Sequence, residues 1–522
     1  MSQFTLPDLF ENNLADYADR TAIRYNGESL SFADFDQQSR QVAGHLQQLG
    51  IQKGDRIGLY CINSDAFALA YYGIIRCGAT VVTINTLLNP KEVAYILNDA
   101  GARALFYFEG FAEGVSTLRT ACPQLEHYFC MGQNRAHDQD SFWGDILNSD
   151  NPFTTPALNA TRDTAAILYT SGTTGQPKGA MLSHHNLVSN IDAARQAMFL
   201  TADDVILVVL PMFHAFAATL GMLMPLHFGC RFVPLPKFDP QLVANTLASE
   251  KITVLPAVPS MYSLLLRLPE AFTAKFDSLR FCISGAAAMP QAVMEQFEQR
   301  FGKLIYEGDG PTECSPVTSV NPVGGKRKLG SIGPPIPGVE MKIMDDQGQE
   351  LPIGDTGEIC VRGPNVMQGY WNRPDETRES FHGEWFRTGD LGHTDEDGYF
   401  FIIDRKKDLI IVNGMNVYPR VIEEVLYQYP PIAEAAVVGE PHELHGEIPV
   451  AYVALKPDQV ADVDSIRKYC QSCLGRHEVP RKVFFLDQLP KNAAGKILKR
   501  ELRKHGELER GVDSRKKGDD ED

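Results

Sequence analysis

The stretch Tyr169-Thr-Ser-Gly-Thr-Thr-Gly-Gln-Pro-Lys-Gly-Ala-Met-Leu-Ser-His184 places a run of small residues and a lysine between two ordered segments. The apolar run Ala165–Tyr169 is typical of a buried strand. Ser183 is a suitable N-cap for a helix that extends to about Met198. The pattern therefore predicts a flexible loop that joins a strand to a helix.

The composition of this loop suits an anion. Glycines let backbone N–H groups approach a phosphate closely, and they stand at Gly172, Gly175 and Gly179. Hydroxyl donors come from Ser171, Thr173 and Thr174, and Lys178 adds a positive charge. The string is not a Walker A loop, because no glycine stands five residues ahead of a Gly-Lys-Ser/Thr. By composition alone, a plain Ser/Thr/Gly linker is the simpler alternative.

The full string resembles the phosphate loop of the adenylate-forming superfamily. That superfamily contains acyl- and aryl-CoA synthetases, luciferases and the adenylation domains of peptide synthetases. Further matching stretches follow in the same order as far as Lys496, so the resemblance covers nearly the whole chain apart from its two ends. It implies that the protein activates a carboxylic acid with ATP.

Size and charge limit the class of protein. A chain of 522 residues exceeds what one hydrophobic core usually supports, so two or more domains are expected. The net charge of −17 disfavours nucleic acid as a partner and requires local positive charge wherever an anion binds. Lys178, Arg405 and Lys496 can supply that charge.

Targeting signals are not visible at the amino terminus. Residues Met1 to Asp8 contain neither a basic nor an apolar segment of the secretory kind, so a cytoplasmic location is expected. The stretch Val205 to Leu226 has no Asp, Glu, Lys or Arg over a length that could cross a bilayer. Because Pro211 and Gly221 interrupt it, we predict instead a buried strand followed by a buried helix, and no transmembrane segment.

The ten cysteines are scattered along the chain. Cys470 and Cys473 form a CxxC pair that is expected to lie within a helix rather than at a strand end. Structural thiols are therefore expected in preference to redox chemistry or zinc. His442 and His445 have HxxH spacing rather than HExxH, which also argues against a zinc site.

The fold class predicted for the first 404 residues is α/β, with parallel sheets covered by helices. The alternating elements before the loop are a helix at 33–49, a strand at 56–61, a helix from 89/90 to 99 and a strand at 104–108. After the loop they are helices at 242–249 and 260–268 and strands at 252–255 and 279–283. Short alternating strands at 339–344 and 357–362 predict a small antiparallel barrel.

The charged residues inside 399–411 interrupt a strand pattern, and this fits a hinge. Beyond it, a helix at 421–427 and strands at 435–438 and 450–455 predict a small α+β module. We therefore predict an N-terminal ATP- and acyl-binding domain over 1–404, a mobile C-terminal domain over 405–505 and a disordered charged tail over 506–522.

The resemblance assigns roles to residues outside the loop. Thr312 and Glu313 contact phosphate and Mg²⁺, with Thr170 and Glu313 as the metal-site pair. Asp390 accepts hydrogen bonds from the ribose hydroxyls. The remaining roles are ribose contact for Arg405, the pivot of the hinge for Lys407, and a bridge between carboxylate and α-phosphate for Lys496. The catalytic set that follows is Lys496, Thr312, Glu313 and Lys178.

The nucleotide-binding set implied by the resemblance is larger. It comprises Thr170, Ser171, Gly172, Thr173, Thr174, Gly175, Lys178, Gly285, Ala286, Glu307, Gly308, Asp309, Thr312, Asp390, Arg405 and Lys496. Two positions depart from the family. Asp309 stands where an aromatic residue usually stacks on adenine, which leaves hydrogen bonding to the base as the alternative. Val421 stands where a glutamate is common, although Glu423 matches.

Apolar and small residues are expected to line the acid pocket. Segments 211–216 and 284–288 match the acyl-binding segments of the family and contribute Phe213, His214, Ala286 and Ala287. They suggest an apolar tail on the substrate, since no basic residue stands there to pair with a second carboxylate. A buried structural histidine is an equally good interpretation of His214.

These observations predict an AMP-forming acyl-CoA synthetase that uses Mg²⁺, ATP and coenzyme A on a medium- or long-chain fatty acid. An aryl-CoA ligase, or a ligase that loads a carrier protein, is the first alternative. No carrier-like Asp-Ser-Leu segment follows the C-terminal module, which favours free coenzyme A. A nucleotide-binding regulator without activity is the second. The expected partners are small molecules, and a homodimer is left open.

Overall fold

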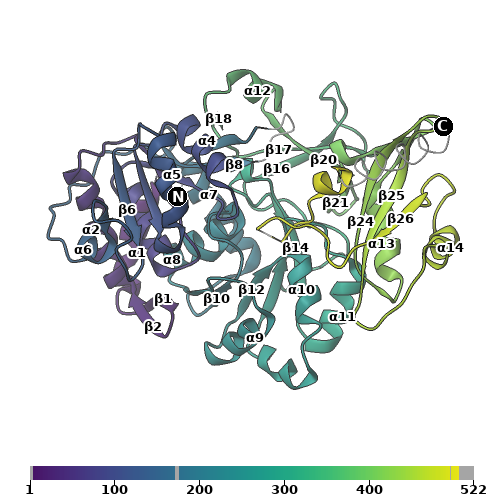
Figure 1. Ribbon diagram of the computed structural model, residues 1–522, viewed down its shortest axis with the longest axis horizontal. Helices are drawn as coiled ribbons and strands as arrows, with labels where there is room; N and C mark the ends of the chain where they lie inside the picture. The colour runs from purple at the N-terminus through teal and green to yellow at the C-terminus, as the bar shows by residue number, and fades with distance from the viewer. Residues whose placement is uncertain (1–3, 171–175, 494, 505–522) are drawn as a thin grey trace, which may run out of the picture.

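The computed structural model describes residues 4–170, 176–493 and 495–504. Two eight-stranded sheets, an antiparallel sheet of five strands and a C-terminal sheet of five strands form the framework (Figure 1). The mixed α/β class predicted from the sequence is confirmed.

The first sheet has the strand order β18-β9-β8-β4-β3-β5-β6-β7. Its strands are β3 (Arg56–Tyr60), β4 (Thr80–Thr83), β5 (Ala104–Phe108), β6 (His127–Met131), β7 (Ser141–Phe142), β8 (Thr164–Thr170), β9 (Lys178–Ser183) and β18 (Gly369–Tyr370). Strands β3 to β8 run parallel, with Val81 opposite Ala166. The predicted βαβ organisation is therefore correct in this half of the molecule.

The second sheet has the order β15-β14-β13-β12-β10-β11-β1-β2. Its strands are β1 (Thr21–Tyr25), β2 (Glu28–Ser31), β10 (Val205–Val208), β11 (Arg231–Pro234), β12 (Val254–Ala257), β13 (Phe281–Ser284), β14 (Ile305–Asp309) and β15 (Ser319–Val320). The six neighbouring strands β1, β11, β10, β12, β13 and β14 run parallel. The loops that follow β13 and β14 therefore lie at the same edge of the sheet.

Helices cover both sheets. They are α1 (Leu6–Tyr17), α2 (Phe32–Gln48), α3 (Asp65–Arg76), α4 (Pro90–Ala100), α5 (Ala112–Ala121), α6 (Trp143–Leu147), α7 (His184–Met198), α8 (Met224–Phe228), α9 (Pro240–Ser249), α10 (Pro259–Leu265) and α11 (Gln291–Phe301). Helix α3 is buried from Phe67 to Arg76, and one apolar cluster contains side chains of this helix and of both sheets. A helix that is apolar on all sides belongs in such a core.

One prediction about the loop is wrong. The loop after Thr170 does not lead directly to a helix, because β9 intervenes and pairs antiparallel with β8, with Tyr169 opposite Gly179. The helix itself begins as predicted, since Ser183 caps α7 and accepts from the Asn186 N–H. Ser171, Gly172, Thr173, Thr174 and Gly175 lie outside the described residues.

The apolar stretch 205–226 is a buried strand followed by a buried helix, as predicted. Strand β10 leads through a turn into a π-helix, Ala217–Leu223, which continues as α8. Throughout the described part of the chain, every helix is too short or too polar to span a bilayer.

A third sheet is antiparallel and combines β16 (Glu340–Met344), β17 (Gly357–Arg362), β19 (Phe381–His382), β20 (Trp385–Thr394) and β21 (Phe400–Arg405), with the short helix α12 (Pro374–Glu379) nearby. The pairing of β16 with β17 agrees with the predicted antiparallel unit. Strand β21 leads through a 3₁₀ turn at Lys406–Asp408 into the last sheet.

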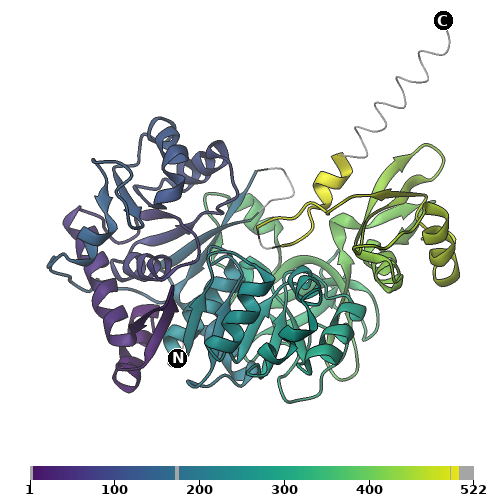
Figure 2. The same ribbon diagram turned by 60° about the horizontal axis from the view of Figure 1, so that its bottom comes forward.

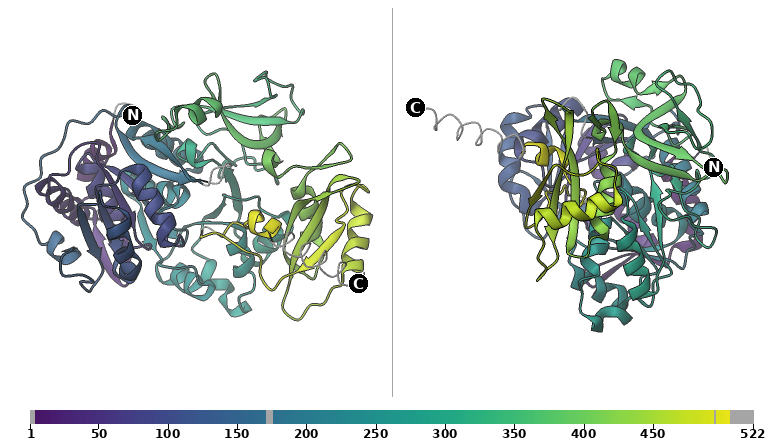
Figure 3. Two further views of the ribbon diagram at one scale, coloured as in Figure 1. Left: turned by 45° about the horizontal axis from the view of Figure 1, so that its top comes forward. Right: turned by 90° about the vertical axis from the view of Figure 1, so that its right-hand side faces the viewer.

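The C-terminal module, which we define as residues 410–504, has two apolar clusters of its own. It contains β22 (Ile410–Val412), β23 (Met415–Val417), α13 (Pro419–Gln428), β24 (Ile432–His442), β25 (Gly446–Leu455), α14 (Val463–Cys473) and β26 (Lys482–Phe485). Figure 2 shows this module, in light green to yellow, beside the rest of the molecule. Its last segment extends back toward the second sheet (Figure 3).

Candidate active site

Glu313 is the centre of the first group of candidate residues. It lies in the turn Thr312–Cys314, which follows β14. Its carboxylate oxygen Oε1 accepts a hydrogen bond from the Tyr370 hydroxyl at 2.9 Å and from the Thr170 hydroxyl at 3.4 Å. The main-chain oxygen of Glu313 accepts from the Met367 N–H at 2.7 Å. Residues distant in sequence therefore fix this carboxylate.

Lys178 belongs to the same group. Its ammonium nitrogen lies 5.4 Å from the centre of the Tyr370 ring, within the range of a cation–π contact. The structure thus brings together Thr170, Lys178 and Glu313, and Thr312 is in the same turn. One carboxylate among hydroxyl groups fits Mg²⁺ that is bound chiefly through substrate phosphates, because this ion prefers oxygen ligands and retains several from outside the protein.

The end of β14 is held rigidly. The main-chain oxygen of Asp309 accepts from the Thr318 N–H at 2.9 Å and from the Thr318 hydroxyl at 3.0 Å. At Gly310 a Cβ atom would lie 1.5 Å from the Pro316 oxygen, so this position accepts glycine alone. This rigidity fixes Asp309 and the turn that carries Glu313.

Asp390 and Arg405 form the second group. They face each other across β20 and β21, and Arg405 Nε lies 3.3 Å from Asp390 Oδ1. Burial and the carboxylate of Asp390 raise the pKa of Asp309, and the cations of Lys496 and Arg405 oppose this rise. Two carboxylates and two cations therefore share one electrostatic environment.

Lys496 reaches this group from the C-terminal module. The preceding residue, Gly495, accepts from the Ser260 hydroxyl through its main-chain oxygen at 3.0 Å. The Lys496 N–H donates to Asn492 Oδ1 at 2.9 Å, which closes a tight turn. Burial and Arg405 lower the pKa of Lys496, whereas Asp390 and Asp309 raise it. The structure therefore has Lys496 docked against the N-terminal part of the chain.

Phe213 and His214 lie after β10. The Phe213 carbonyl accepts from the Thr83 hydroxyl at 2.7 Å. The Phe216 N–H donates to His214 Nδ1 at 3.3 Å, so a neutral ring carries its proton on Nε2. Burial and the charge of Lys496 lower the pKa of His214 to about 4. His214 is accordingly a neutral group beside the docked lysine.

The segment after β13 approaches both Phe216 and β14. A Cβ atom at Gly285 would lie 3.4 Å from the Phe216 ring and 3.3 Å from the Gly308 oxygen. Ala286 has φ of 65°, in the left-handed region that costs energy for a residue other than glycine. Ala286 and Ala287 are half-buried. The two segments predicted for the acid therefore meet beside the end of β14.

Glu307 has a different environment from the other nucleotide candidates. Its side chain is buried, and Oε1 accepts from the Met289 N–H at 3.1 Å. Burial raises the pKa of Glu307 to about 7, and Arg420 of the C-terminal module opposes this rise. The Glu307 carboxylate is therefore bound to the main chain of the segment after β13, and Arg420 lies near enough to lower its pKa.

The residues at the predicted hinge differ in their contacts. Lys407 is exposed. Its neighbour Lys406 binds Glu358 of β17 at 3.1 Å and Asp346, in the turn after β16, at 2.5 Å. On the other side, the Arg420 N–H donates to Asp404 Oδ2 at 2.8 Å. Lys407 is therefore an exposed position between anchored neighbours.

Two residues of this region were not predicted from the sequence. Tyr370 binds Glu313, and Ser260 binds Gly495. Both contacts join segments far apart in the chain, and no local pattern marks either residue. A glycine followed by two aromatic residues, Gly369 to Trp371, is the only hint that the sequence contains at Tyr370.

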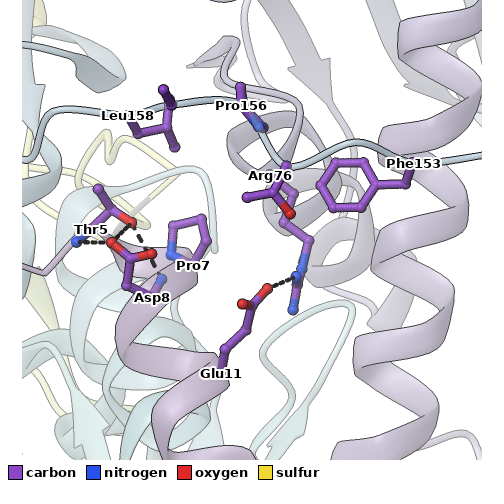
Figure 4. A pocket seen from close by; sticks show the side chains of 10 residues that line it. Thr5, Pro7, Asp8, Glu11, Arg76, Phe153, Pro156 and Leu158 are labelled. Carbon is purple, nitrogen blue, oxygen red and sulfur yellow. Dashed lines mark hydrogen bonds and ion pairs between the residues drawn. The ribbon is translucent and has the colours of Figure 1, made fainter.

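A small cavity of about 250 Å³ lies beside Arg76 (Figure 4). Its lining comes from α1, the end of α3 and residues 153–158, and it contains none of the predicted site residues. Arg76 is buried there and pairs with Glu11 at 2.8 Å and with Asp36. The paired carboxylates compensate its charge, so this cavity is a feature of the packing around α1.

The fold, with its site at the strand ends and a lysine supplied by the C-terminal module, defines a ligase of the adenylate-forming class. A family model described as AMP-binding enzyme matches residues 10–371, and one described as AMP-binding enzyme C-terminal domain matches residues 421–496. The chain belongs to the AMP-binding enzyme family, and its resemblance to the acyl-CoA synthetases is confirmed. ATP and coenzyme A are the co-substrates of such ligases, and Mg²⁺ is their usual ion.

Relatives with assigned names support this placement. A long-chain-fatty-acid–CoA ligase of Escherichia coli O6:H1 is 36% identical over 530 residues, which cover 96% of this chain and 94% of the relative. One from Bacillus subtilis is 35% identical over 525 residues, covering 95% and 94%.

Solved structures share the fold. The anthranilate CoA ligase AuaEII in complex with anthranoyl-AMP has a TM-score of 0.91 at 29% identity, covering 97% of this chain and 98% of that one. ATP-bound MatB from Rhodopseudomonas palustris has a TM-score of 0.89 at 33% identity, covering 96% and 99%.

Proposed function

We propose that this protein is a fatty-acid–CoA ligase. It joins a fatty acid to the α-phosphate of ATP, with release of pyrophosphate, and then transfers the acyl group from AMP to the thiol of coenzyme A. The observation that carries the proposal is the docked Lys496, which shares its surroundings with Asp390, Asp309 and Arg405. Because a carboxylate and a phosphate repel each other, a cation placed between them favours their reaction.

The roles of the remaining residues follow from their positions. Asp390 accepts from the ribose hydroxyls, with Arg405 beside it. Thr170, Lys178 and Thr312 bind the phosphates, and Glu313 with Thr170 holds Mg²⁺, which supplies charge neutralisation when it is bound. The resemblance adds residues 171–175, which lie outside the described residues, to the phosphate-binding set. Asp309 replaces stacking on adenine with a polar contact to the base.

The acid lies against the segments after β10 and β13. Phe213, Ala286 and Ala287 present apolar and small side chains, and neutral His214 adds one N–H donor. The fatty-acid ligases among the relatives favour an alkyl chain at this place. An aryl acid is the second candidate, because structural neighbours include an anthranilate and a benzoate CoA ligase.

The C-terminal domain turns between the two half-reactions. We divide the chain into an N-terminal domain at 1–404, a C-terminal domain at 405–505 and a tail at 506–522, with Lys407 as the pivot. The support for this division is that the module from 410 has separate apolar clusters, while its contact with the rest near Lys496 is polar. Coenzyme A reacts after Lys496 has left the site.

The test uses purified protein with Mg·ATP and a panel of short, medium, long-chain and aromatic acids, each with and without coenzyme A. Pyrophosphate and AMP are measured. Coenzyme-A-dependent turnover with medium or long fatty acids is the expected result. Turnover with aromatic acids alone would show that the substrate is an aryl acid and not a fatty acid. Pyrophosphate release that is independent of coenzyme A would indicate a carrier protein as the acceptor.

We also predict a cytoplasmic location, which fractionation of cells that express the chain would test. Whether the protein is a homodimer is measured by light scattering of the purified protein.

A further inference from the structure

Asp99 lies in the last turn of α4, where a carboxylate faces the negative end of the helix dipole. Its side chain is only 14% exposed. Local placement of this kind is unfavourable, and proteins retain such choices mainly where the residue has another task. The contacts of Asp99 show what this task is.

Three groups compensate the carboxylate and the helix end. The Tyr169 hydroxyl donates to Asp99 Oδ2 at 2.7 Å, and Arg373 donates to Oδ1 at 3.0 Å. The indole N–H of Trp371 donates to the main-chain oxygen of Asp99 at 3.0 Å. The partners come from β8 and from the segment after β18, so a single residue joins two segments that are distant from each other in the chain.

Each of these partners is next to a residue of the phosphate site. Tyr169 directly precedes Thr170, and Trp371 directly follows Tyr370. The hydroxyls of Thr170 and Tyr370 both donate to the Glu313 carboxylate. The main-chain N–H of Trp371 donates to the main-chain oxygen of Gly179 at 2.8 Å, and Gly179 directly follows Lys178.

Tyr95 extends this arrangement by one helical turn, since it stands four residues before Asp99 on the same face of α4. Its hydroxyl donates to the main-chain oxygen of Pro177 at 3.2 Å, and Pro177 directly precedes Lys178. A hydrogen bond with Tyr95 and the charge of Asp99 raise the pKa of Arg373. Helix α4 therefore contacts the chain at Tyr169 and again at Pro177.

We propose that Asp99, assisted by Tyr95, is a positioning residue that sets Thr170, Lys178 and Tyr370 around Glu313 for the binding of Mg·ATP. Asp99 touches neither substrate nor metal and acts through these side chains. The inference rests on the proposed function, because it concerns the phosphate site of the same reaction.

The chain supplies a matched control. Like Asp99, Asp140 accepts from one tyrosine hydroxyl and one arginine. The Tyr107 hydroxyl donates to it at 2.6 Å, and Arg119 donates to it at 2.6 Å. It is 3% exposed, so its loss costs folding at least as much as the loss of Asp99. Tyr107 belongs to β5, which is separated from β8 by β4 and β3.

The experiment compares Asp99→Ala with Asp140→Ala. Measured are the acid-dependent exchange of pyrophosphate into ATP, the transfer from supplied acyl-AMP to coenzyme A, the melting temperature, and Mg·ATP binding by calorimetry. For Asp99→Ala we expect kcat/KM for Mg·ATP to fall about 10- to 100-fold, as for residues that orient a binding group, with transfer unchanged. Asp140→Ala should lower the melting temperature but leave Mg·ATP binding unchanged.

Asp99→Asn should recover most of the exchange rate, because the amide oxygen still accepts from Tyr169. The proposal is overturned if Asp99→Ala binds Mg·ATP like the wild type, if it loses both half-reactions equally, or if Asp140→Ala weakens Mg·ATP binding as much. Should Asp99→Ala fail to fold, Tyr169→Phe against Tyr107→Phe makes the same comparison by removing one hydroxyl from each site. Absence of exchange in the wild type with every acid would contradict the proposed function, while calorimetry would still decide the role of Asp99.

Discussion

Ser260 on α10 donates its hydroxyl to the main-chain oxygen of Gly495 at 3.0 Å, immediately before Lys496. Gly495 has φ of +80°, and a Cβ atom there would lie 2.9 Å from Val258 and 3.0 Å from the Ser260 oxygen. Glycine therefore permits both the backbone conformation and the close approach. The bond holds Lys496 beside Asp390 and Asp309, where the proposed adenylation needs it.

Lys496→Ala should abolish most of the adenylation activity and leave the second half-reaction intact. Loss of one preorganised donor to a developing charge costs about 100- to 1000-fold in rate. Acid-dependent exchange of pyrophosphate into ATP measures the first step, and transfer from supplied acyl-AMP measures the second. Lys491→Ala, which removes a lysine of the same segment bound to Glu434, is the control and should retain both. Equal loss of the two steps in Lys496→Ala would refute the assignment.

Lys407→Pro should slow thioester formation more than adenylation. Proline fixes φ near −65° and so restricts the backbone at the proposed pivot, whereas Lys496 is already docked in the structure and needs no rotation there for the proposed adenylation. Thioester output and pyrophosphate exchange are measured together. Lys407→Ala keeps a rotatable backbone and should behave like the wild type; unchanged thioester output in the proline variant would exclude this pivot.

Glu313→Gln should raise the Mg²⁺ concentration needed for half-maximal adenylation and lower the rate, because it removes the negative charge among the candidate metal ligands. Tyr370→Phe should act in the same direction but more weakly, about tenfold, since it removes one hydrogen bond to a charged group. Mg²⁺ titrations at saturating ATP compare the two. A Tyr370→Phe variant more impaired than Glu313→Gln would show that the tyrosine has a separate role.

Glu307→Gln should become more stable relative to the wild type as pH rises. Burial raises the pKa of Glu307 to about 7 from its ordinary 4.5. The folded state thus binds this proton more tightly than the unfolded state, and the stability that is present below pH 4.5 is lost as pH rises through 7.

Glutamine retains an acceptor for the Met289 N–H and stays neutral throughout. Melting temperatures measured from pH 5 to pH 8 should therefore show a difference between variant and wild type that grows with pH. A difference that is constant over this range would mean that Glu307 does not titrate there.

Local patterns located much of the fold. Helices α2, α4 and α7 begin where Ser31, Asn89 and Ser183 form capping boxes, and such caps are visible in the sequence. Strand β9 was missed because Lys178 and Gly179 belong to a run that reads as a loop, and only its pairing with β8 makes it a strand. Strand β12 begins two residues later than predicted for a similar reason, since its register is set by neighbouring strands.

The motifs predict a set of candidate residues but not their arrangement in space. The structure has Glu313 in the turn after β14, and Asp390 and Lys496 near Asp309, the last residue of that strand. Tyr370 and Asp99 could not be found in this way, because their contacts join segments that are distant in the chain. Glu307 illustrates the converse, since its motif position suggested the nucleotide, whereas its carboxylate binds the Met289 N–H.

Few polar contacts join the C-terminal module to α10 and α11 of the N-terminal part in the described residues, and each of them can be altered by a single substitution. Besides the bond of Ser260 to Gly495, they include a long one from the Gln291 N–H to Glu424 at 3.4 Å. Each such bond contributes about 1 kcal/mol net, which is less than about twice the thermal energy. If the C-terminal domain turns as proposed, substitutions at these contacts alone will alter the fraction of each catalytic cycle that it spends in either pose, while every group proposed to bind substrate stays the same.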